Sequence, residues 1–274
     1  MKRTSLRARL LSAPYIVWAA IFIVVPLFIV VYYAFTDRSG VFSLSNITAL
    51  ADYKDTFIIS VWYSVIATVI TLVIAYPFAY ALSRFGANTQ RMMMLLIMLP
   101  MWMNLLIRTY SWMNILERNG IINNVLAGFG IEPLKMIGTP GAVILGMVYN
   151  YLPYMILPIY TVMSKLDITL LEAADDLGAN AFQRLRTLVI PLSMPGVISG
   201  ITMVFVPSVS TFYISQKLGG GKIMLIGDAI ERQIQQQYNY NLGASISLVL
   251  MVMILISMAI MNRFASDDAE RLVV

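Results

Sequence analysis

The segment 164–195 holds the charged residues whose spacing is most informative. Apolar residues recur at helical intervals on both sides of Gly178, which predicts two short amphipathic helices broken at that glycine. Asp167 or Thr169 can cap the first helix. Acidic residues precede the glycine and polar or basic residues follow it: Glu172, Asp175, Asp176, Gln183, Arg184 and Arg186. Such a helix pair suits docking on another protein rather than catalysis.

Aromatic and amide side chains gather at two places that suit the path of a cation. They are Trp102, Asn104, Tyr110 and Trp112 in one apolar region, and Tyr149 and Asn150 in another. Aromatic ring faces attract ammonium groups by roughly 0.5–2 kcal/mol. The alternative for the first group is an interfacial belt, because Trp and Tyr gather at headgroup level, and Arg108 is expected to mark the edge of its apolar stretch. We keep Trp102, Asn104, Tyr149 and Asn150 as candidates for a substrate path.

Several chemistries are excluded by composition. The chain has no Cys and no His, so it lacks thiol nucleophiles, disulfides, imidazole bases and the usual zinc and haem ligands. Its methionine runs are better explained by packing than by metal binding. The Gly219–Lys222 stretch lacks the spacing of a phosphate-binding loop. We expect no catalytic residues, no metal site and no cofactor, and therefore no enzyme.

The elements that carry these residues are predicted to be membrane helices. Hydrophobic residues make up 59% of the 274 residues and charged residues 12%, against roughly 45–50% and about 25% in soluble proteins. A membrane helix needs about 20 apolar residues. Six stretches free of Asp, Glu, Lys and Arg qualify, at about 14–35, 59–82, 92–107, 139–163, 196–212 and 243–261. The fold class is therefore an all-α integral membrane protein.

Basic residues indicate the orientation of the chain. Lys and Arg are denser in 1–13, 83–91, 164–195 and 262–274 than in the segments between them, with Lys2, Arg3, Arg7 and Arg9 contributing most. The positive-inside rule then predicts that both termini are cytoplasmic. The first apolar stretch is longer than a signal-peptide core, so we interpret it as an uncleaved anchor. The net charge of +5 fits lipid headgroups and not nucleic acid, since the basic residues lie beside apolar runs.

The charged segment resembles the cytoplasmic loop of ATP-binding cassette (ABC) permeases in importers that use a solute-binding protein. That loop carries Glu-Ala-Ala, three residues, Gly, nine residues, an aliphatic residue, any residue, an aliphatic residue and Pro. This chain has the corresponding residues at those spacings: Glu172, Ala173, Ala174, Gly178, Leu188, Ile190 and Pro191. The usual Ile-x-Leu-Pro is replaced by Leu-Val-Ile-Pro, which conserves volume. The resemblance implies that Glu172, Ala173, Ala174, Gly178 and Pro191 belong to an ATPase-coupling loop.

Longer stretches resemble the spermidine/putrescine importers, and in particular the first of their two permease subunits. They are AYPFAYALSR (75–84), MLPMWMNLLIRTYSWMNIL (98–116), VILGMVYNYLPYMILPIY (143–160) and KLDITLLEAADDLGA (165–179). The resemblance covers about residues 55–262. It implies the type I ABC importer permease fold, with six transmembrane helices, in the cytoplasmic membrane. It also implies three protein partners: a second permease subunit, a cytoplasmic ABC ATPase in two copies and an extracytoplasmic solute-binding protein.

The expected organisation has four parts. They are a cytoplasmic segment (1–13), the first transmembrane helix with an external loop (14–54), a permease core with the coupling loop at 164–195 (55–262), and a cytoplasmic tail (263–274). The expected function is to form half of the path of an ATP-driven polyamine importer, with ATP hydrolysed by the partner.

Two alternative functions remain. The same class of permease carries ferric iron, sulfate, molybdate or phosphonate, and fold alone does not choose among these cargoes. An ion-coupled secondary carrier usually needs intramembrane acids or histidine, or broken helices in two matching halves. The six apolar stretches contain no ionisable side chain, which disfavours the carrier.

The topology can be tested by cysteine labelling in intact cells, because the natural chain has no Cys. Ser39→Cys and Gly220→Cys should react with an impermeant maleimide from outside. Ser5→Cys, Ala179→Cys and Ala269→Cys should react only after lysis. The reverse pattern would refute the orientation.

Overall fold

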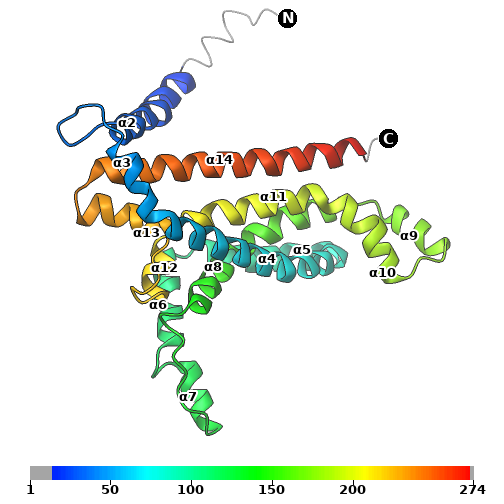
Figure 1. Cartoon of the computed structure of the whole chain (residues 1–274). Coiled ribbons are helices and arrows are strands. Elements are labelled where there is room, and N and C mark those ends of the chain that lie inside the picture. The colour runs from blue at the N-terminus through cyan, green and yellow to red at the C-terminus, as the bar shows by residue number, and fades with distance from the viewer. Residues whose placement is uncertain (1–13, 272–274) are drawn as a thin grey trace, which may run out of the picture. The chain divides into compact units, whose positions relative to one another are not determined.

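The computed structural model describes residues 14–271, with side chains described as far as residue 263. The predicted segment 1–13, with its four basic residues, and the last three residues of the tail lie outside the described residues. Helices form the regular structure of the described part, together with an isolated bridge between Thr36 and Phe42 (Figure 1).

Six apolar spans are present among the described residues if one bent pair of helices counts as a span. Five helices are long and apolar enough to cross a membrane: Pro14–Ala34, Ser45–Arg84, Pro140–Met163, Ala181–Val209 and Tyr240–Arg263. The bent pair is Ala87–Trp102 with Leu105–Gly128. The predicted all-α membrane architecture is therefore confirmed.

The helices within these spans and between them follow in chain order. They are α2 (Val25–Ala34), α3 (Ser45–Thr48), α4 (Lys54–Arg84), α5 (Ala87–Trp102), α6 (Leu105–Leu116), α7 (Ile121–Gly128), α8 (Pro140–Met163), α9 (Ile168–Asp176), α10 (Ala181–Arg184), α11 (Ile190–Val209), α12 (Tyr213–Leu218), α13 (Ile226–Glu231) and α14 (Tyr240–Arg271). Wider π turns occur at Ala20–Val24, Leu185–Val189 and Arg232–Gln236, and a 3₁₀ helix at Ala49–Tyr53.

The described chain divides into two compact units. The first joins residues 14–54 with 229–252. Asn241 at the start of α14 donates from Nδ2 to the carbonyl oxygens of Thr36, at 2.8 Å, and Tyr33, at 3.2 Å, while the Ser245 hydroxyl donates to Ala34 at 3.0 Å. These bonds satisfy carbonyl groups that the end of a helix otherwise leaves without partners.

The second unit contains residues 55–228 and 253–271, and its α4 packs through a stripe of small residues. The buried side chains of α4 are Ser60, Ser64, Ala67, Thr68, Thr71, Ala75, Ala79 and Leu82. The hydroxyls of Ser60, Ser64, Thr68 and Thr71 each donate to the carbonyl four residues earlier, at 2.6–2.7 Å. The helix thus carries polar residues in an apolar setting without leaving their hydrogens unpaired.

Helices α8 and α11 form the most extensive helix contact of this unit, and Figure 1 shows them side by side. A Cβ atom added to Gly196 would lie 2.8 Å from the Pro158 carbonyl oxygen and 3.1 Å from the Ile159 Cα. A Cβ added to Gly200 would lie 2.6 Å from the Met155 sulfur. The two glycines, four residues apart on α11, therefore allow the backbones to approach closely.

The third span, predicted as one apolar stretch at about 92–107, is broken in the structure. It breaks at Met103 and Asn104, and its halves are bent by 91°. Pro100 lies in the last turn of α5, and the Asn104 side chain accepts a hydrogen bond from the Leu106 N–H at 2.7 Å, which starts a new helix. Proline and an N-cap asparagine so close together explain the break.

The second predicted loop helix also differs from expectation. Residues after Gly178 do not form a separate short helix, because α10 continues through the π turn Leu185–Val189 into α11 as one helix, Ala181–Val209. The π turn ends two residues before Pro191, which has no N–H to donate within the helix. The fifth span is accordingly longer than the predicted 196–212 at its start.

The α8–α11 contact predicts a strong effect of a single methyl group. Gly196→Ala should lower the free energy of unfolding by about 1–3 kcal/mol, since overpacking forces the backbones apart. Gly128→Ala in α7 is the matched control, because nothing lies within 4 Å of its Cβ position. Thermal unfolding of the purified subunit in detergent measures both. Equal stability of the two variants would contradict the packing argument.

Candidate functional site

The turn at Gly178 closes the first loop helix, α9. The glycine has φ +80°, in the left-handed region that other residues enter at a cost. Its N–H donates to the Asp175 carbonyl at 2.9 Å, and the Ala179 N–H donates to the Ala174 carbonyl at 3.0 Å. Asp167 caps the start of α9 by accepting from the Thr169 N–H at 3.0 Å. The predicted helix, its cap and its glycine stop are all confirmed.

An ion pair fixes α9 against α10. Arg184 Nη1 lies 2.8 Å from Asp175 Oδ1 and 2.6 Å from Oδ2. Asn180 and Gln183 start α10 with reciprocal side chain to backbone hydrogen bonds of 2.9 Å. Sequence reasoning placed acids before Gly178 and bases after it, but it did not pair them. These contacts stabilise the turn between the two helices.

The loop is anchored by one face and exposed on the other. Leu171 is buried in the core cluster that includes Met155, Ile159 and Val189. Glu172 and Ala173, the next residues, are exposed, and Ala174 is half-buried. The Glu-Ala-Ala side chains are thus presented outward from a segment that is tied to α8 and α11 from within.

Glu172 also lines a cavity of about 470 Å³ beside the loop. Residues of α4, α5, α8 and the loop line it, among them Tyr80, Arg84, Gln90, Leu171, Asp175 and Arg184. Arg84 lies 5.1 Å over the Tyr80 ring, and Tyr160 donates to Gln90 Oε1 at 2.8 Å. Gln90 donates in turn to the Ser83 and Phe85 carbonyls. Sequence reasoning missed Gln90, because its partners are backbone carbonyls and a tyrosine distant in sequence, and it also missed Arg84, although Tyr80 lies only four residues before it.

The four path candidates do not form one cluster. Trp102 is 73% exposed and Asn104 caps α6. Tyr149 packs edge to face with Trp112, with ring centroids 5.3 Å apart. Asn150 is 2% exposed; its Nδ2 donates to the Gly146 carbonyl, while Oδ1 has no partner among the described residues. Among those residues, no ring contact or hydrogen bond joins Trp102 or Asn104 to Tyr149 or Asn150.

Arg108, which follows the third predicted stretch, is buried. It is 9% exposed, and its Nε and Nη1 atoms have no hydrogen-bond partner among the described residues. If the bent pair is counted as a span, this arginine is an ionisable residue within it. The predicted stretch 92–107 ends before Arg108 and itself holds no charge, so the charges of the bent pair, Arg91, Arg108, Glu117 and Arg118, come from its wider bounds.

Basic residues gather around another cavity of the second unit. Arg118 and Lys135 line a cavity of about 490 Å³ with Leu116, Pro133, Met136 and Ile137. Lys222 beside Lys135 lowers the pKa of Lys135, mainly through a direct side-chain contact and then by charge repulsion. A like-charged pair of this kind becomes favourable when an acidic group approaches.

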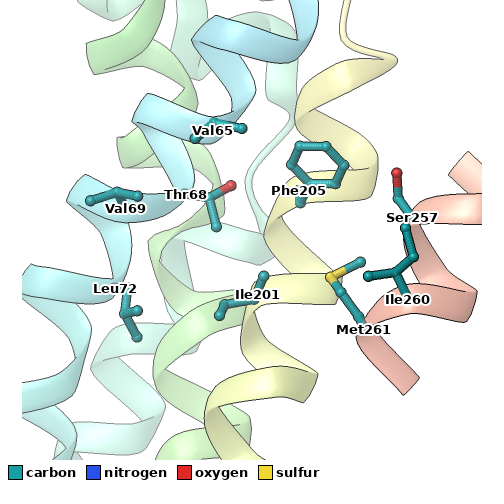
Figure 2. A pocket seen from close by; sticks show the side chains of 9 residues that line it. All are labelled: Val65, Thr68, Val69, Leu72, Ile201, Phe205, Ser257, Ile260 and Met261. Atoms are coloured by element: carbon teal, nitrogen blue, oxygen red, sulfur yellow. The ribbon is translucent and has the colours of Figure 1, made fainter. Parts of the chain in front are cut away.

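An apolar groove of about 330 Å³ separates α4, α11 and α14 within the second unit, and Figure 2 shows its lining. Its two hydroxyl groups, on Thr68 and Ser257, donate to carbonyls of their own helices. The other lining residues are Val65, Val69, Leu72, Ile201, Phe205, Ile260 and Met261. The groove therefore suits apolar contacts and not a polar ligand.

The chain is similar to known transport proteins over most of its length. Residues 76–266 match the family described as "Binding-protein-dependent transport system inner membrane component". The spermidine/putrescine transport system permease protein PotB of Haemophilus influenzae is 37% identical over 79% of this chain and 79% of its own length. The protein of the same name from Escherichia coli is 35% identical over 79% of this chain and 82% of its own.

Two solved structures share the fold. One is a bacterial ABC transporter involved in the import of the acidic polysaccharide alginate, with a TM-score of 0.77, 15% identity and 94% of both chains covered. The other is a bacterial alginate ABC transporter in complex with an alginate pentasaccharide-bound periplasmic protein, with a TM-score of 0.76, 16% identity, and 95% of this chain and 93% of that chain covered. The expected type I importer permease fold is confirmed.

Proposed function

We propose a function for this chain from one premise: it belongs to the family of binding-protein-dependent transport system inner membrane components. It is a permease subunit of an ATP-driven polyamine importer and forms half of the translocation path. The observation that carries the coupling role is the anchored loop, which exposes Glu172 and Ala173 while Leu171 is buried in the core. The polyamine cargo is supported by the spermidine/putrescine permeases to which the chain is similar.

The structure of the loop suggests how an ATPase would move the path. An ATPase docked on α9 displaces a segment whose angle is held by the Asp175–Arg184 ion pair. Because Ala181–Val209 is one helix, displacement at its loop end carries along the whole of α11. Helix α11 is packed on α8 through Gly196 and Gly200, so the two helices move as a pair.

The lack of a phosphate-binding loop and the presence of basic residues indicate the partners of this chain. It has no phosphate-binding loop, so ATP is hydrolysed by a cytoplasmic ABC ATPase present in two copies. A second permease subunit completes the path. The basic residues Arg118, Lys135 and Lys222 support docking of an acidic face of an extracytoplasmic solute-binding protein. The loop and both termini are cytoplasmic in this arrangement, and the spans contact lipid.

One observation favours a second candidate cargo within the same function. The buried Arg108 guanidinium, with two nitrogen atoms unpartnered among the described residues, suits an oxyanion such as sulfate, molybdate or phosphonate. The aromatic pairs favour an organic cation instead. Proteoliposomes holding both permeases and the ATPase, with ATP inside and the solute-binding protein outside, decide between them. Labelled spermidine should accumulate and labelled sulfate should not. Sulfate uptake without spermidine uptake would overturn the polyamine proposal.

The coupling role predicts the outcome of changes at Gly178. Nothing lies within 4 Å of its Cβ position, so Gly178→Val costs only the left-handed strain, about 1–2 kcal/mol, or roughly five- to thirty-fold in the docking conformation. ATPase retention on the affinity-purified permease and spermidine uptake should both fall. Gly178→Asn should retain more of each, because asparagine tolerates this conformation better.

Gly130→Val is the matched control for that experiment. Gly130 has φ +76° and likewise has nothing within 4 Å of its Cβ position, but it lies outside the loop. The control should suffer the same strain and keep the ATPase. Equal loss of ATPase in the two valine variants would show that strain alone, and not coupling, explains the effect at Gly178.

A further inference from the structure

Two tyrosines and a lysine form a cation site that the function above does not use. The Lys217 Nζ lies 5.2 Å from the centroid of the Tyr110 ring and 5.7 Å from that of Tyr213. The two rings are 6.3 Å apart and meet edge to face at 77°. One ammonium group thus lies within range of two aromatic rings.

We propose that Tyr110 and Tyr213 bind an ammonium group of the incoming polyamine, and that Lys217 occupies this site until the polyamine displaces it. This inference rests on the proposed polyamine function. Lysine ends in a primary ammonium on a flexible alkyl chain, which is also the chemistry at each end of an alkyl polyamine. A site that holds one can hold the other.

The rings stand on a well-anchored base. Tyr213 begins α12, whose Ile214 and Leu218 are fully buried. These two side chains pack so closely on α8 that a Cβ at Gly146 would lie 2.7 Å from Ile214 and 2.5 Å from Leu218. On α6, Thr109 next to Tyr110 is also fully buried. The backbone segments that carry the two rings are therefore held in place, while the Lys217 side chain has a long, rotatable stem.

The site lies where a delivered cargo would first meet the path. In Figure 1, α9 and α10 lie at one end of α11, and α12 lies near the other end. Helix α12 begins four residues after α11 ends at Val209. In the proposed orientation this is the external end, which also carries the basic residues Lys135 and Lys222.

The weak attraction of the site suits an ammonium group that binds and leaves readily. Cation–π attraction amounts to roughly 0.5–2 kcal/mol, so neither the lysine nor a polyamine is held firmly. The tethered lysine acts as a ligand at an effective concentration of about millimolar. Dilute polyamine in bulk solution then competes poorly, whereas polyamine released by a docked binding protein competes well. Charge repulsion also requires Lys217 to leave before a second ammonium group enters.

The competing explanation is an ordinary interfacial group, in which a lysine reaches toward headgroups beside aromatic residues. That explanation gives Lys217 a role in insertion or stability and none in cargo dependence. The two explanations differ in one measurement, namely whether replacing Lys217 lowers the spermidine concentration that gives half-maximal uptake.

The experiment uses the complete importer in proteoliposomes with ATP inside. Lys217→Gln should lower the half-maximal spermidine concentration about three- to tenfold, and should raise uptake in the absence of the binding protein. Tyr110→Leu combined with Tyr213→Leu should reduce uptake several-fold, while Tyr110→Phe with Tyr213→Phe should retain it because the ring faces remain. Lys54→Gln, which removes an exposed lysine with no described ring contact, should behave like the natural protein.

A chemical rescue keeps the test decisive if Lys217→Gln assembles poorly. Since this chain has no Cys, Lys217→Cys can be assembled with cysteine-free partners and treated with aminoethyl methanethiosulfonate, which restores an ammonium group. The half-maximal concentration should then return toward that of the natural protein, and the neutral methyl reagent should not restore it. Unchanged values in both the Gln and Cys variants, with normal spermidine uptake by the natural protein, would overturn this inference alone. Absence of spermidine uptake by the natural protein would overturn the proposed function instead.

Discussion

The close approach of α8 and α11 determines how the rest of the second unit can work. Gly196 and Gly200 leave no room for side chains between the two backbones. In a membrane, where apolar burial gives helices little reason to associate, such contacts supply much of the packing energy. The proposed coupling loop connects the end of α8 to the start of the α10–α11 helix. A loop tied at both ends to two closely packed helices is suited to transmit a displacement, as the proposed function requires, and poorly suited to absorb it.

Proline and the turns beside it explain how the spans depart from straight helices. The π turns at Ala20–Val24 and Leu185–Val189 end two residues before Pro26 and Pro191. In each case the wider turn accommodates a residue that cannot donate an N–H. At Pro100 the chain takes another course, because Asn104 can cap a new helix. The same residue type therefore continues one span and breaks another, according to whether a capping residue follows it.

Features that the local sequence determines were predicted correctly, and features that depend on tertiary contacts were missed. The lengths of the apolar stretches predicted the six spans, since the thickness of the hydrocarbon layer sets the length of helix that is needed to cross it. The glycine stop at Gly178 was also predictable, because one residue type determines that conformation. The bend at Asn104, the continuous helix through Pro191 and the burial of Arg108 were missed. Each of these depends on contacts with neighbouring segments that offset a local preference, such as the helix-breaking effect of proline or the exposure of a charge. The hydropathy of a segment does not contain that information. The Asp175–Arg184 pair and the Lys217 contacts with two rings were missed because pairing depends on the tertiary arrangement.

The charges of the chain imply a division of labour in the complex. A polycation loses much hydration on entering a narrow path, and a carboxylate is the group that best offsets that cost. The apolar stretches of this sequence contain no acidic residue, and Arg108, which is buried just after the third stretch, has the wrong sign for such a cargo. Ring faces and carbonyls can guide an ammonium group but cannot neutralise two or three of them. In the proposed function the countercharge comes from the second permease or the binding protein, and this subunit contributes coupling, guidance and control of entry. A path whose attractive charges lie largely on a partner releases its cargo when the two halves separate, so weak binding by this half supports release rather than hindering transport.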